Sequence, residues 1–232
     1  MDSAGNVYVT GWSGIDYATA YATVKYNSAG VEQWVARYDR GSRDVAQGVA
    51  VDGSGNVYVT GFSTGGFSDS DYATIKYNSG GVQQWVAVYN VSDYDEAHAI
   101  ALDNLGNVYA TGESKGAAGN TDFATVKYDA NGTELWVARY DAPAHGYDSS
   151  YRVVLDTSHN VYVTGASSDN DYTTIKYTQA AAVGGIAELP AVAETGTSGM
   201  GSTTYAVLAG AAAGVLAFAV LATLSVKRWR VR

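Results

Sequence analysis

The chain has 232 residues, with 14 Lys and Arg, 23 Asp and Glu, and no cysteine. Without cysteine, the protein has no disulfides, zinc–thiolate sites, iron–sulfur clusters or cysteine nucleophiles. Four of the basic residues lie in the last six positions, which leaves 10 basic against 23 acidic side chains in residues 1–226. A region with this excess of acidic side chains would repel a phosphate backbone, which argues against nucleic acid as a partner.

Four copies of one sequence pattern fill most of the chain, at offsets of 50, 51 and 53 residues. Asp-x-x-Gly-Asn-Val-Tyr-Val-Thr-Gly begins at Asp2, Asp52, Asp103 and Asp156, with Ala110 in place of one Val and His159 in place of the first Gly. A string of the type Tyr-Ala-Thr-Val-Lys-Tyr begins at Tyr21, Tyr72, Phe123 and Tyr172, and Trp-Val-Ala-x-Tyr begins at Trp34, Trp85 and Trp136. A fourth string covers residues 47–52, 98–103 and 151–156.

Each of these strings predicts a β-strand, because it is short, rich in Val, Ile, Tyr, Thr and Trp, and bounded by turn residues. The strand predicted for Asn-Val-Tyr-Val-Thr carries side chains that can pack on both of its faces. This favours a position inside stacked sheets over one that faces solvent. The glycines of the connections suit tight hairpins that need a positive φ. His159 in such a position indicates that the last repeat has diverged.

Four short antiparallel strands in about 50 residues is the period of a β-propeller blade. Over residues 1–178 the pattern resembles the bacterial SBBP β-propeller repeat family, and its strand order is similar to that of the NHL repeat. The resemblance implies an all-β propeller of four-stranded blades in a surface or secreted setting, with no shared catalytic chemistry. We expect repeats at about 1–51, 52–102, 103–155 and 156–178.

The strand count predicts an incomplete ring. By the NHL-like order the inner strand ends at Asp52, and the others lie at 56–60, 72–77 and 84–89. The chain then starts at the second strand of one blade and stops after the third strand of another, giving 14 strands and two complete blades. A closed propeller has about 4–8 blades, and open edges favour aggregation. We therefore expect a fragment of a larger propeller, or an open array that closes by self-association.

The composition changes after Tyr177. Residues 179–204 are rich in Ala, Gly, Thr and Ser and predict a flexible linker. Residues 205–226 carry no charge and, at 1.5 Å per residue, are long enough for a helix that crosses a bilayer core of ~30 Å. The basic residues of the tail, 227–232, predict that it is cytoplasmic. The expected localisation is the cell membrane, single-pass, with the blades outside.

The region before this apolar span resembles a sortase-type sorting signal. Leu189-Pro190 and Thr195-Gly196 precede the span and the basic tail. Four residues separate the two pairs where that family has one, so a plain membrane anchor is the expectation.

Catalytic and metal-binding patterns are weak. His98, His145 and His159 fall in different repeat positions, and His98 takes the place of Gln47 and Tyr151, which favours a packing role. Asp52, Asp103 and Asp156 occur once per repeat at a turn, where Asx-turn hydrogen bonding explains them. The acidic runs 69–71, 93–96 and 169–171 could offer oxygens to calcium, but solvated loops are favoured over a calcium site. We expect no cofactor and no enzyme activity.

Loop lengths predict which end of the blades carries function. The turns between inner and second strands and between third and outer strands keep their lengths, whereas the second-to-third and blade-to-blade loops vary. We call the first end the turn rim and the second the loop rim; variable loops on a rigid scaffold often carry function. The loop rim holds aromatic and polar residues outside the repeat pattern, suited to a sugar or peptide. The candidate ligand-binding residues are Trp12, Phe62, Phe67, Asp69, Asp93, Tyr94, His145 and Tyr147.

Three functional hypotheses follow. The first is a membrane-anchored binding or adhesion module for a glycan, peptide or surface protein. The second is a structural stalk without a ligand, and the third is part of a propeller enzyme. Unique polar residues gathered on one rim would favour the first or third hypothesis over the second.

Overall fold

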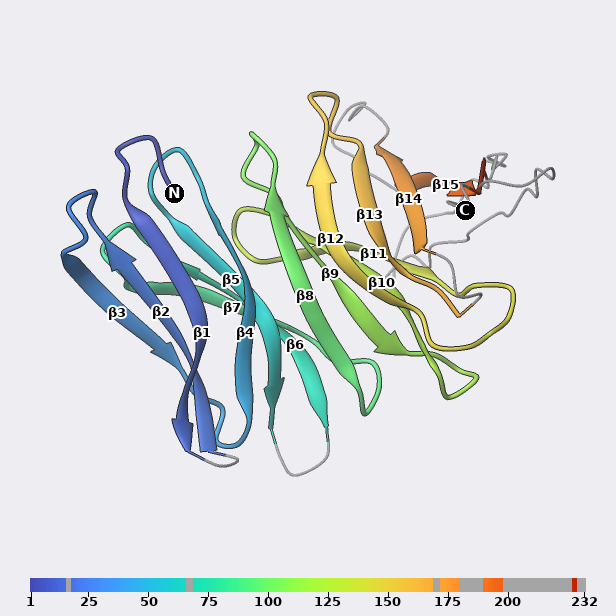
Figure 1. Cartoon of the computed structure of the whole chain (residues 1–232), viewed down its shortest axis with the longest axis horizontal. Coiled ribbons are helices and arrows are strands. Elements are labelled where there is room, and N and C mark those ends of the chain that lie inside the picture. Colours follow the sequence, from blue (N-terminus) through green and yellow to red (C-terminus); the bar gives the residue numbers. More distant parts are fainter. Residues whose placement is uncertain (16–17, 66–68, 169–171, 180–189, 198–226, 229–232) are drawn as a thin grey trace.

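Figure 1 shows the computed structural model of the chain, which describes residues 1–15, 18–65, 69–168, 172–179, 190–197 and 227–228. All regular elements in these ranges are β-strands, arranged in four sheets.

The first blade contains β1 (Val7–Ile15), β2 (Ala18–Tyr26) and β3 (Glu32–Tyr38). The second contains β4 (Asp44–Val51), β5 (Val57–Thr64), β6 (Ser70–Tyr77) and β7 (Gln83–Tyr89). The third contains β8 (Asp95–Leu102), β9 (Val108–Lys115), β10 (Thr121–Tyr128) and β11 (Glu134–Tyr140). The fourth contains β12 (Ser149–Leu155), β13 (Val161–Ala166), β14 (Tyr172–Gln179), β15 (Pro190–Thr197) and β16 (Lys227–Arg228).

The strands β1 to β14 confirm the predicted all-β class and the predicted strand order. Within each blade, consecutive strands from β1 to β15 pair antiparallel, and the first blade begins at the second-strand position. The four sheets lie in a row, with the first and fourth at opposite ends (Figure 1). The inner strands β4, β8 and β12 pack side by side along this row.

Part of the range predicted as a linker forms a strand, β15, while residues 180–189 and 198–204 lie outside the described residues. This strand pairs antiparallel with β14 and takes the outer position, which Trp-Val-Ala-x-Tyr strands occupy in the other blades. Pairing satisfies backbone groups that β14 would otherwise expose at a sheet edge. β16 pairs parallel with β15.

The predicted membrane span, 205–226, lies outside the described residues. Among the residues that the structure does describe, no helix has the length and apolar character needed to cross a membrane.

The Asp at the start of each repeat organises the turn between the inner and second strands. Asp52 Oδ1 accepts hydrogen bonds from the backbone N–H groups of Ser54 and Asn56, both at 2.9 Å. Its Oδ2 accepts from Asn56 Nδ2 at 2.7 Å and from the Tyr58 hydroxyl at 3.2 Å. The same contacts recur around Asp2, Asp103 and Asp156. The Asx-turn interpretation is therefore confirmed. His159 adopts a φ of 61° where the other copies use glycine.

The core lies between blades. Aromatic residues of one blade pack against the second and third strands of the next, and the interface of the second and third blades contains Tyr58, Tyr72, Ala87, Tyr89, Val108, Ala110, Val126 and Tyr128. Tyrosine hydroxyls also hydrogen-bond across the interfaces: Tyr21 donates to Ala73 O at 3.2 Å, and Tyr72 to Ala124 O at 3.1 Å. These two interfaces thus combine apolar burial with a satisfied tyrosine hydroxyl, whereas Phe123 takes the equivalent position at the interface of the third and fourth blades.

The N-terminal end of the row presents an uncovered interface. Val7 and Val9 of β1 are exposed, whereas their counterparts Val57 and Val59 of β5 are fully buried. Within the described residues no earlier blade covers Val7 and Val9. Self-association through open blade edges stays a prediction.

Each inner strand contains a β-bulge at the same position. In β8 the pairing with β9 passes from Ala97–Gly112 to Ala99–Thr111, so His98 is the extra residue. Gln47 in β4 and Tyr151 in β12 are skipped in the same way. A bulge redirects the side chain of the extra residue and shifts the register on one side of it.

Candidate functional site

Four positions near the loop rim differ from blade to blade within an otherwise regular scaffold. Each inner strand has a buried Asp at or directly before its start: Asp44, Asp95 or Asp148. The first three variable positions are the residue directly before this Asp, the residue directly after it, and the residue three places after it. The fourth is on the second strand, opposite the residue directly after the Asp. The second blade has Arg43, Val45, Gln47 and Phe62 at these positions; the third has Tyr94, Glu96, His98 and Glu113; the fourth has Tyr147, Ser149, Tyr151 and Ala166. Among the three blades whose inner strand the structure describes, only the third brings carboxylate and imidazole side chains together there.

Glu96 and Glu113 lie directly opposite each other across β8 and β9. Their counterparts in the second and fourth blades are the uncharged pairs Val45–Phe62 and Ser149–Ala166. Like charges directly opposite each other destabilise a sheet. The two carboxylates therefore cost stability at a place where sister blades avoid charge, a feature typical of functional sites.

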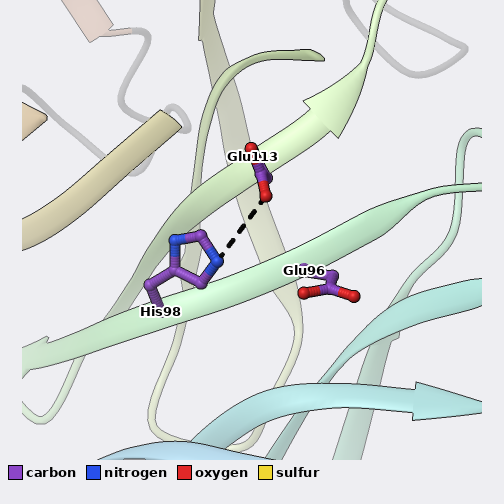
Figure 2. A group of neighbouring side chains, drawn as sticks. All are labelled: Glu96, His98 and Glu113. Atoms are coloured by element: carbon purple, nitrogen blue, oxygen red, sulfur yellow. Dashed lines mark ion pairs between the residues drawn. The ribbon is translucent and has the colours of Figure 1, made fainter. Parts of the chain in front are cut away.

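His98 completes this group, and Figure 2 shows its imidazole turned toward Glu113. Its Nε2 lies 3.9 Å from Glu113 Oε1, close enough for an ion pair when the ring is protonated and too far for a hydrogen bond. Its Nδ1 lies 3.0 Å from Ser150 O on β12, and the ring stacks on Tyr151 at a centroid distance of 5.7 Å. The fourth blade thus fixes the orientation of the imidazole. We call Glu96, His98 and Glu113 the Glu–His–Glu cluster.

Two hydroxyl groups hold the Glu113 carboxylate. The Tyr94 hydroxyl donates to its Oε1 and the Thr121 hydroxyl to its Oε2, both at 3.2 Å. The side chains of His98 and Glu113 are mostly buried, with exposed fractions of 13% and 17%. The cluster is therefore partly shielded from solvent, which strengthens the electrostatic interactions within it.

The charges of the cluster shift the acidity of its members. Burial, and then the negative charge of Glu113, raise the pKa of Glu96 to about 7, while Arg43 and the Tyr94 hydroxyl oppose that shift. Burial, and then the charges of Glu96 and Glu113, also raise the pKa of Tyr94. Each effect reflects negative charge crowded where solvation is weak.

A second group of acids, Asp122, Asp141 and Asp148, lies beside the loop before β12. Each of them has a protein partner: Asp122 pairs with Arg139 at 2.9 Å, and Asp141 with His145 at 2.7 Å. Asp148 accepts hydrogen bonds from the backbone N–H groups of Ala142 and Ser168. These contacts organise a loop, so the Glu–His–Glu cluster is the better candidate site.

One of the residues predicted from sequence contacts the cluster, and a second is its neighbour in the chain. Tyr94 contacts Glu113, and its neighbour Asp93 forms an ion pair with Lys115 at 2.8 Å. Trp12 and Tyr147 are 59% and 73% exposed, as a ligand surface requires. However, Trp12 lies on β1 of the first blade and Tyr147 in the loop before β12 of the fourth, so the structure does not gather them on one surface.

The remaining predicted residues have different surroundings. Phe62 was expected to be exposed, but it is only 3% exposed, and the Arg43 guanidinium lies 4.9 Å from its ring centroid. His145 is exposed beside Asp141, and Asp69 is exposed just before β6. Phe67 lies outside the described residues, as do residues 169–171 of one acidic run. Asp71 of another run is buried and paired with Arg40 at 2.6 Å.

The sequence interpretation missed the cluster itself. It assigned His98 to a packing position, considered Glu96 only within the acidic run 93–96, where a solvated loop was favoured over a calcium site, and gave Glu113 no role. Comparison of the repeats position by position could have found them, because Glu96 replaces Val45 or Ser149, and Glu113 replaces Phe62 or Ala166.

Comparison with known proteins gives a family match for two segments of the repeat region. Residues 33–68 and 84–121 match the SBBP β-propeller repeat. The first match runs from β3 through β5 and the second from β7 through β9, so each joins the outer strand of one blade to the next blade. The second match contains the whole Glu–His–Glu cluster. The search of curated proteins found no match to the chain.

Proposed function

We propose that this protein is an extracellular binding module, held at a membrane by its C-terminal apolar segment, whose propeller repeats bind a glycan at the loop rim. The observation that carries this proposal is the replacement of uncharged pairs by Glu96 and Glu113 in one blade of a regular scaffold. A stalk without a ligand has no use for charges that destabilise its sheet.

A glycan suits the chemistry around the cluster. Carboxylates accept hydrogen bonds from sugar hydroxyls, and the partly exposed ring of Tyr94 offers an apolar face beside them. The Glu113 carboxylate is already oriented by two hydroxyl groups. Such preorganisation lowers the entropic cost of binding.

We expect Tyr94→Ala and Glu113→Ala to weaken glycan binding by about tenfold or more each, because each removes a contact worth at least 1.4 kcal/mol at the centre of the surface. Immobilised glycans probed with the full chain provide the measurement. Leu105→Ala is the matched control, since Leu105 is 67% exposed on the turn rim of the same blade. Equal losses from all three variants, or binding of extended peptides and not of glycans, would refute the glycan proposal.

The membrane part of the proposal rests on the uncharged segment 205–226 and its basic flank. A protease added to intact cells is expected to degrade the blades and to leave the tail, 227–232, protected. Release of the protein from membranes by alkaline carbonate would contradict anchoring.

A further inference from the structure

We infer that the Glu–His–Glu cluster binds a divalent first-row transition metal ion of the Zn²⁺ type. The inference rests on the binding role proposed above and deepens it, because it names what the acidic pair holds. The potential ligand atoms of Glu96, His98 and Glu113 all lie within 4.8 Å of one another, and they come from two adjacent strands.

The spacing needs only a small contraction to bind such an ion. Ligand atoms at the usual Zn–N and Zn–O distances of about 2.1 Å lie roughly 3.4 Å apart in a tetrahedral site. The observed His98 Nε2–Glu113 Oε1 distance is 3.9 Å. A shift of about 0.5 Å between these two atoms closes the difference, which leaves the hydrogen bonds of Glu113 to Tyr94 and Thr121 in place.

The orientation of His98 is the observation that separates this cluster from an ordinary group of surface acids. A backbone carbonyl can only accept a hydrogen bond, so Nδ1 must carry the proton that it shares with Ser150 O. The neutral ring then has its lone pair on Nε2, the atom that faces Glu113. Metal-binding histidines are typically fixed in this way, with the second ring nitrogen donating to a carbonyl or carboxylate.

Charge also favours a cation between the glutamates. Among the neighbouring strands, the positive group that acts on Glu96 is Arg43, which belongs to the preceding blade and lies over the ring of Phe62. Lys115, on β9, is paired with Asp93. A divalent ion would relieve the repulsion between the opposed carboxylates, while Tyr94 and Thr121 keep Glu113 in place.

The ligand set selects a transition metal over calcium. Calcium takes 6–8 oxygen ligands, whereas one imidazole and two carboxylates suit Zn²⁺ and its neighbours and leave at least one coordination position open. An open position next to the loop rim would let the ion contact an oxygen of the bound glycan. The metal would then contribute directly to ligand binding.

A calorimetric titration of the full chain with Zn²⁺ alone tests the site without any other ligand. We expect one strong site per chain, with no comparable binding of Ca²⁺. The variants Glu96→Val, His98→Gln and Glu113→Ala should each lower the Zn²⁺ affinity by about 100-fold or more. Each of these residues already occurs at the same position of a sister blade, so the variants should fold, which circular dichroism can check.

Imidazole nitrogen NMR provides a second measurement that identifies the histidine involved. Zn²⁺ should shift the Nε2 signal of His98 and leave its Nδ1 protonated, with no matching change at His145 or His159. Unchanged Zn²⁺ affinity in His98→Gln, equal affinity for Ca²⁺, or no binding would overturn the inference. Loss of glycan binding in the Tyr94 and Glu113 variants with no Zn²⁺ site would leave the proposed function standing alone.

Discussion

Replacing Gly61 with alanine is expected to destabilise the protein by about 3 kcal/mol, whereas the same replacement of Gly11 should change stability by less than about 0.5 kcal/mol. Both glycines end the Val-Tyr-Val-Thr-Gly string of their repeat. A Cβ on Gly61 would lie 2.0 Å from the carbonyl oxygen of Val45, and a Cβ on Gly11 would have no neighbour within 4 Å. The difference arises because the bulged inner strand β4 packs closely on Gly61, whereas among the described residues no inner strand lies beside β1.

The third and fourth blades repeat the close approach. A Cβ on Gly112 or Gly165 would lie 2.0 Å from the carbonyl oxygen of Glu96 or Ser149, so alanine there should cost as much as at Gly61. Unfolding in urea, monitored by near-UV circular dichroism, gives the free energy of unfolding of each variant. A large loss in Gly11→Ala would contradict the expectation and would mean that another strand covers the edge of β1 in solution. The same experiment thus bears on self-association.

Much of the fold could be predicted from the sequence because each repeat carries its own local signals. The Asp, Gly, Asn and Tyr of one string define a turn through contacts made within seven residues, as around Asp52, so the turn needs no tertiary information. Fourfold repetition then made chance agreement implausible. Strand β15 was missed because its composition is that of a linker, and only the unpaired edge of β14 explains its pairing.

The candidate site could not be predicted so easily, because it depends on register. The turn between β8 and β9 pairs Leu102 with Val108 and Ala99 with Thr111; continued without interruption, this register would place Ser114 opposite Glu96. The bulge at His98 shifts the pairing by one residue and places Glu113 there instead. No local signal in the sequence reports this shift. Phe62 was misassigned because its burial is likewise a feature of the tertiary structure: it is 3% exposed, and the Arg43 guanidinium from the loop before β4 lies over its ring.

The bulge also shows how one scaffold accommodates different chemistry. In the second, third and fourth blades it lies between the buried Asp of the loop rim and the regular part of the inner strand. It sets the direction of one side chain, and that side chain is Gln47, His98 or Tyr151 according to the blade. A substitution at these positions changes the loop rim, and at His98 it also changes contacts with the next blade, since the imidazole hydrogen-bonds to Ser150 O and stacks on Tyr151.

The protein is expected to unfold cooperatively in alkaline solution, between about pH 10 and 12, because its interfaces bury many tyrosines. Burial raises the pKa of Tyr77 to about 12, and the pKa values of Tyr21, Tyr72, Tyr128 and Tyr177 are also raised by burial. Their side chains are at most 3% exposed. In the unfolded chain the same groups titrate near pH 10.

The direction of the effect follows from proton binding. Above pH 10 the unfolded chain loses these protons while the folded chain keeps them, so stability is full below pH 10 and falls as the pH rises. Above pH 10, each such tyrosine lowers the free energy of unfolding by about 1.4 kcal/mol per pH unit, and five of them lower it by about 7 kcal/mol per pH unit. A domain stable by about 5–15 kcal/mol would therefore unfold within one to two pH units.

Absorbance of tyrosinate at alkaline pH, recorded together with far-UV circular dichroism, measures both events in one titration. The ionisation of the buried tyrosines should coincide with the loss of β-structure. Tyr72→Phe is the matched variant, because Phe123 holds the same position in the third blade, and it should reduce the pH dependence by about one proton. Ionisation of all tyrosines near pH 10 in a chain that keeps its β-structure would show that the aromatic interfaces between blades are open to solvent.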